Sequence, residues 1–164
     1  MDVRRKRVKP ITIIIITMVV LFVIAILYVF TPIGFWGVTL DGEYQMIITV
    51  NGEHELMATM ENNTSAHALK RILPRTINMR DYGGMEKIGM LWKGLPRNDM
   101  SISANPGDII LFMGNMFVIY YESNSWNFTK FGHINDVTHE ELREIFGSGN
   151  ATITLSLPAP ADTP

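Results

Sequence analysis

The sequence predicts a mainly β protein, in which one transmembrane helix precedes a single closed antiparallel β-barrel with two short helices. From Gln45 onward, about eight short strand-like runs alternate with turn-forming Asn, Gly and Pro residues. Two segments carry apolar residues at helical spacing, and one long uncharged apolar stretch lies near the N-terminus. A closed barrel leaves no sheet edge exposed, which favours it over a two-sheet sandwich, the alternative arrangement.

The apolar stretch, residues 11–30, reads ITIIIITMVVLFVIAILYVF and is long enough to cross a bilayer as a helix. Residues 1–9 are strongly basic and are therefore expected on the cytoplasmic side, which places the C-terminal domain outside the cell. The alternative is a cleaved signal peptide, but the run exceeds the usual signal core and no Ala-x-Ala-like site follows it. We therefore predict a single-pass protein of the cell membrane, held there by residues 11–30.

This interpretation divides the 164 residues into five parts. They are a cytoplasmic segment (1–9), a transmembrane signal anchor (10–31), a linker (32–43), a barrel domain (44–157) and a disordered tail (158–164). Without cysteine there is no disulfide framework, thiolate zinc site or thiol nucleophile. Most of the acidic residues follow the basic N-terminus, so the domain is acidic and nucleic acid is not an expected partner.

The first half of the domain predicts a hairpin and a helix. Gln45 to Val50 and Glu53 to Met60 flank Asn51-Gly52, a pair that tolerates the positive φ values of a type I′ turn. The apolar residues of 66–73 then recur at helical spacing after a cluster of capping residues, and Pro74 ends the run.

The second half predicts seven further strands and a helix. Glycines at 83 and 84 separate the first two strands, and Gly114-Asn115 separates two apolar runs that form another hairpin. The expected strands are 75–80, 87–92, 101–103, 108–113, 116–123, 130–134 and 151–157, and the helix is 137–146.

Polar and aromatic side chains that could face a ligand gather around the Tyr82-Gly83-Gly84 turn. The guanidinium of Arg80 presents planar donors for a carbonyl or carboxylate, and Tyr82, Glu86 and Tyr120 could line a groove with it. Tyr120 and its neighbour Tyr121 must point to opposite faces of their strand, so at most one of them shares a given side. Glu86 and Lys87 are expected to form a solvated pair.

The sequence carries no motif for a metal site, a serine nucleophile or nucleotide binding. The four histidines are widely spaced, so no metal site is predicted; His133 alone has a neighbour, Asp136, that could orient it. A Gly-x-Ser-x-Gly elbow, a P-loop and a dinucleotide fingerprint are all absent, and no cofactor is expected. The predicted ligand-binding residues are Arg80, Tyr82, Glu86, Asn115, Tyr120 and His133.

Several short motifs, taken together, carry a family resemblance. They include Leu73-Pro74-x-Thr76, Asp81-Tyr82-Gly83-Gly84-x-Glu86-Lys87, Pro106-Gly107-Asp108-Ile109, Gly132-His133-Ile134 and the segment 147–155. With these motifs the chain resembles the bacterial cyclophilin-like domain family over Met46 to Leu157. The resemblance implies an eight-stranded cyclophilin-like barrel with two flanking helices, and it implies no particular reaction.

The resemblance also bears on prolyl isomerase activity. Cyclophilins place an Arg beside an apolar proline pocket, and Arg80 follows a comparable helix here, but the Phe-His pair that precedes that Arg is missing. The leading hypothesis is therefore a binding module for a peptide or small ligand. A divergent extracytoplasmic isomerase or folding helper using Arg80 is the second hypothesis, and a structural protein of the cell envelope is the third.

Overall fold

The computed structural model describes residues 18–22, 44–147 and 149–159. The predicted cytoplasmic segment and linker lie outside these residues, as do most of the predicted transmembrane helix and the end of the predicted tail. Residues 18–22 are helical, and none of the helices in the described part is long and apolar enough to cross a membrane. The strands all belong to the unit Asp41–Pro164.

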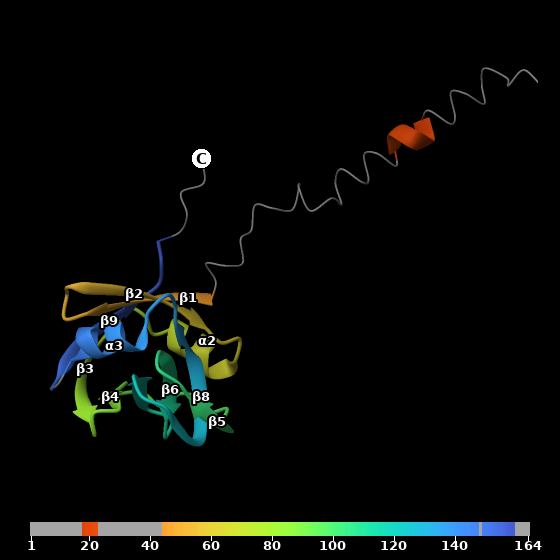
Figure 1. Cartoon of the computed structure of the whole chain (residues 1–164). Helices are drawn as coiled ribbons and strands as arrows, with labels where there is room; N and C mark the ends of the chain where they lie inside the picture. Colours follow the sequence, from red (N-terminus) through yellow and green to blue (C-terminus); the bar gives the residue numbers. More distant parts are fainter. Residues whose placement is uncertain (1–17, 23–43, 148, 160–164) are drawn as a thin grey trace, which may run out of the picture. The chain divides into compact units, whose positions relative to one another are not determined.

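This unit is mainly β, as predicted, with two short helices (Figure 1). Its helices are α2 (Thr64–Lys70) and α3 (His139–Phe146). Its strands are β1 (Gln45–Val50), β2 (His54–Met60), β3 (Arg75–Tyr82), β4 (Glu86–Met90), β5 (Met100–Ala104), β6 (Asp108–Phe112), β7 (Met116–Tyr120), β8 (Asn124–Ile134) and β9 (Ala151–Ser156).

The strands form one antiparallel sheet in the order β2-β1-β9-β3-β4-β7-β6-β8-β5. A further pairing of β2 with β8 closes eight of them into a ring and leaves β5 attached to β8 alone. The prediction missed the length of β8, whose first half pairs with β5 and whose second half pairs with β6. The first half of β8 contains several Asn and Ser residues, and this composition is typical of a loop.

Local chemistry accounts for the turn and the helix ends. Asn51 and Gly52 have φ values of 52° and 75°, so both adopt the left-handed conformation expected of the predicted hairpin turn. The side chain of Asn63 caps α2 by accepting from the amide of Ala66 at 2.9 Å. Thr138 and Glu141 form a capping box at the start of α3.

Two patterns of burial distinguish the strands. Along β1 and β9, inward residues are buried and alternate residues are more accessible, as expected when only one face of a strand meets the core. Along β4, β6 and β7, four consecutive residues are buried. Both faces of these three strands must therefore be covered.

Separate apolar clusters cover the two faces. The main core fills the inside of the ring and includes the stacked rings of Phe117 and Phe131, whose centroids lie 5.8 Å apart. A smaller cluster lies on the outer face, where Ala104 of β5 and Phe128 of β8 pack against residues of β4, β6 and β7. Thus β5 and the first half of β8 cover the outside of the ring.

Close packing at Gly132 allows the ring to close. Gly132 is opposite Met60 in the β2–β8 pairing, and a Cβ added to it would lie 2.2 Å from the carbonyl oxygen of Thr59. Any side chain here would push β2 and β8 apart.

We expect Gly132→Ala to lower the free energy of unfolding by about 1 to 3 kcal/mol, the usual cost of overpacking a tight site. Gly94→Ala is the matched control, because a Cβ there meets nothing within 4 Å. Urea denaturation followed by circular dichroism would measure both changes. Equal stability of the two variants would contradict the importance of this contact.

Candidate functional site

A cavity of about 370 Å³ opens on the outer face of the ring, and we name it the outer cavity. Its walls come from β3, β4, β6, β7 and β8, and they are mainly apolar. Five aromatic and three methionine side chains contribute, namely Tyr82, Phe112, Tyr120, Trp126, Phe128, Met85, Met113 and Met116. Such a lining suits an apolar or aromatic group, because thioethers and ring edges both pack well on aromatic surfaces.

Strand periodicity and register bring four of the predicted residues to this cavity. Arg80 and Tyr82 are two residues apart on β3 and so share a face. Across the pairings, Tyr82 is opposite Glu86, which is in turn opposite Tyr120 on β7. Arg80 is opposite Ile88, and all five side chains line the cavity.

The buried end of the outer cavity is polar. Glu86 is only 9% exposed and accepts a hydrogen bond from the Tyr120 hydroxyl, which in turn accepts from the amide of Asn124 at 3.2 Å. Burial raises the pKa of the Glu86 carboxyl, and the bond from Tyr120 opposes that shift. Burial raises the pKa of the Tyr120 hydroxyl, and its hydrogen bond to Glu86 raises it further.

The predicted solvated pair of Glu86 and Lys87 is wrong, because both are buried and they point to opposite faces of β4.

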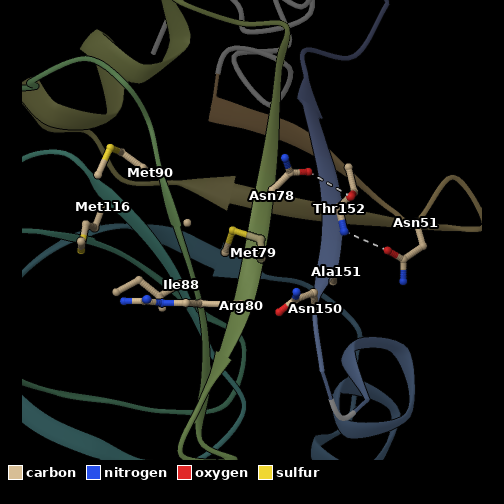
Figure 2. A pocket seen from close by; sticks show the side chains of 11 residues that line it. Asn51, Asn78, Met79, Arg80, Ile88, Met90, Met116, Asn150, Ala151 and Thr152 are labelled. Atoms are coloured by element: carbon tan, nitrogen blue, oxygen red, sulfur yellow. Dashed lines mark hydrogen bonds between the residues drawn. The ribbon is translucent and has the colours of Figure 1, made fainter.

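Arg80 lines both the outer cavity and a second hollow of about 610 Å³. Figure 2 shows the side chains of the second hollow. Within the described part of the chain, its guanidinium has no hydrogen-bond or ion-pair partner. The second hollow is more polar, and two of its three side-chain amides are engaged: Asn78 accepts from the Thr152 hydroxyl at 3.2 Å, and Asn51 accepts from the Thr152 backbone at 2.9 Å. Of the side chains that line both hollows, Arg80 is the polar one, and it is unengaged in the described residues.

The other two predicted residues do not line the outer cavity. Asn115 lines a separate hollow next to Trp92. His133 is oriented by Asp108, whose Oδ1 lies 2.8 Å from its Nδ1, and not by Asp136, the candidate that the sequence offered. In the described residues, no group of three or more potential ligands could hold a metal ion.

Three cavity residues on β8 were absent from the prediction: Asn124, Trp126 and Phe128. They alternate along the strand and so face the same side. The spacing of Trp126 and Phe128 was the available sequence signal, because two aromatics two residues apart are typical of one face of a strand.

The fold agrees with the protein family that the sequence matches. The Cyclophilin-like family matches residues 48–156, which is most of the folded unit. The chain belongs to the cyclophilin-like family. The match confirms the cyclophilin-like domain and fold expected from the motifs. No curated protein sequence matches the chain.

Two solved structures share the fold of the cyclophilin-like domain at low identity. The solution structure of the hypothetical protein AF2241 from Archaeoglobus fulgidus is 11% identical with a TM-score of 0.54, covering 70% of this chain and 95% of that one. The structure of McbB in complex with tryptophan is 12% identical with a TM-score of 0.54, covering 73% of this chain. The match spans 47% of McbB, so this chain corresponds to about half of it. Both likenesses show a shared fold.

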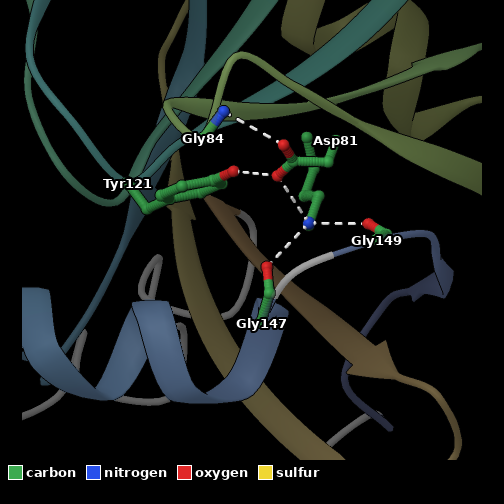
Figure 3. Close-up of polar contacts among 6 residues, drawn as sticks. Asp81, Gly84, Tyr121, Gly147 and Gly149 are labelled. Atoms are coloured by element: carbon green, nitrogen blue, oxygen red, sulfur yellow. Dashed lines mark hydrogen bonds and ion pairs between the residues drawn. The ribbon is translucent and has the colours of Figure 1, made fainter.

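Behind the outer cavity, the cyclophilin-like domain holds an ion pair between the buried Lys87 and the partly exposed Asp81 (Figure 3). Lys87 is 0% exposed, and its Nζ donates to Asp81 at 2.9 Å and to the carbonyls of Gly147 and Gly149 at 2.9 and 2.8 Å. Hydrogen bonds from Lys87 and Tyr121 lower the pKa of Asp81 to about 2. All three ammonium donors are therefore used, and they tie β4 to the segment that follows α3.

We expect Lys87→Met to lower the free energy of unfolding by about 1 to 3 kcal/mol, because it leaves two carbonyls without their donor and removes the counter-charge of Asp81, which keeps its bond from Tyr121. Lys93→Met is the control, since Lys93 is exposed and lies outside this network. Chemical denaturation of both variants would measure the difference. A Lys87→Met protein as stable as the control would show that the network contributes little.

Proposed function

We propose that this protein is a membrane-anchored, extracytoplasmic bacterial protein whose cyclophilin-like domain binds a peptide segment or a small molecule in the outer cavity. The observation that carries the proposal is the cavity itself, which combines an aromatic and methionine lining with an unengaged guanidinium at its edge. Concave, mainly apolar sites with a few polar groups are typical of ligand pockets.

The proposed anchor rests on the sequence. A basic segment, residues 1–9, precedes an uncharged apolar run at 11–30, and this order is typical of a signal anchor with its N-terminus in the cytoplasm.

A second candidate function is prolyl isomerisation. A prolyl isomerase needs an apolar pocket for the proline ring beside a guanidinium that polarises the proline carbonyl. Arg80 lines a cavity with such an apolar lining. The third hypothesis, a structural envelope protein, would be favoured by an exposed apolar patch without a groove. The outer cavity therefore favours the two binding functions over it.

We expect the full-length protein to bind an isotope-labelled Ala-Pro peptide in NMR titrations. Trp126→Ala should weaken binding about tenfold, as truncation of an aromatic contact residue commonly does. Trp92→Ala is the matched control, because Trp92 is also largely exposed but lies outside the outer cavity.

Exchange spectroscopy on the same samples separates the two functions. Binding without accelerated cis/trans exchange would support the binding module. Accelerated exchange that disappears in Arg80→Ala would identify an isomerase. If the peptide binds equally well to both tryptophan variants, the outer cavity is not its site.

A further inference from the structure

Glu86 is an exception among the buried charges of the domain. The structure describes three buried charged residues, and two of them have ion-pair partners. Lys87 pairs with Asp81 at 2.9 Å, and Asp108 pairs with Lys130 at 2.7 Å. Glu86 has no such partner in the described part of the chain, and its contact is the neutral hydroxyl of Tyr120.

An unpaired buried carboxylate is costly. Removing it from water without a counter-charge disfavours the ionised form, and a single phenol uses only one of the roughly four hydrogen bonds that a carboxylate accepts. Either a proton or a bound cation can relieve that cost. Because Glu86 lines an open cavity, a cation carried by a ligand can reach it.

Arg80 supplies the opposite charge to the same cavity. It is opposite Ile88, while Glu86 is opposite Tyr82, so Arg80 and Glu86 are diagonal neighbours on one face. Diagonal neighbours lie roughly 7 to 8 Å apart at Cα. The two side chains form no ion pair within 4.0 Å, although their charges are opposite and both are unengaged by any other charge in the described residues.

The size and lining of the cavity limit what can bind between these charges. At about 370 Å³ the cavity is near the small end of the range for ligand pockets, which favours a small molecule over an extended chain. Its aromatic and methionine walls suit an aromatic or large apolar side chain.

We infer that the outer cavity binds an apolar α-amino acid, with its ammonium at Glu86, its carboxylate at Arg80 and its side chain against the aromatic wall. This inference rests on the proposed binding function and specifies the ligand class. An α-amino acid carries both charges next to one apolar group, and so it matches all three features of the site.

Isothermal titration calorimetry of the full-length protein with three probes tests the inference. L-phenylalanine carries both charges, N-acetyl-L-phenylalanine lacks the ammonium, and L-phenylalaninamide lacks the carboxylate. We expect L-phenylalanine to bind most tightly, with each blocked probe weaker by about tenfold, as expected for the loss of a charge-assisted hydrogen bond.

Variants assign each charge to its residue. Glu86→Gln should weaken the binding of L-phenylalanine about tenfold and leave the binding of N-acetyl-L-phenylalanine unchanged. Arg80→Gln should also weaken the binding of L-phenylalanine about tenfold, but it should leave the binding of L-phenylalaninamide unchanged. Glu55→Gln and Arg71→Gln are matched controls, since both residues are exposed and lie outside the cavity. Glutamine keeps the hydrogen bond to Tyr120, so Glu86→Gln is expected to fold.

The outcomes separate this inference from the proposed function. If the blocked probes bind as tightly as L-phenylalanine, the cavity binds ligands but the charge assignment is wrong. If none of the three probes binds while the Ala-Pro peptide does, the ligand class is wrong and the binding function stands. If neither the probes nor the peptide binds, both are wrong.

Discussion

The arrangement of this domain depends on covering three strands from both sides. In β4, β6 and β7 four consecutive residues are buried, so the inner core covers only one of the two faces of these strands. The other half is covered because β8 extends beyond the ring and carries β5 with it, bringing Phe128 and Ala104 over the outer face. The cover stops short of β3, and the outer cavity is the space that remains at its edge.

The same constraint explains the contrasting environments of two neighbouring residues on β4. Alternation turns Lys87 toward Asp81 and the carbonyls of Gly147 and Gly149, where each of its donors finds an acceptor. It turns Glu86 outward into the covered side of the cavity, where Tyr120 is its partner. A strand with both faces buried thus carries one satisfied charge and one that lacks a counter-charge, and the second is the one a ligand can reach.

The sequence predicted the strand ladder well, because alternation, turn residues and caps are local signals. It also grouped Arg80, Tyr82, Glu86 and Tyr120, which strand periodicity brings to one face. It failed at β8, where Asn and Ser obscured the strand, and so it missed Trp126 and Phe128. The burial of Lys87 depends on carbonyls about sixty residues away, and no local pattern in the sequence reports such a contact.

The most direct test of the central claim, that the outer cavity is a ligand site, is the indole N–H signal of Trp126 in two-dimensional NMR of the full-length protein. Addition of L-phenylalanine should shift this signal in a saturable manner, because Trp126 lines the cavity. The indole of Trp92, which lines a separate hollow, should remain where it is. A Trp126 signal that stays fixed while that of Trp92 moves would contradict the account and place the ligand elsewhere.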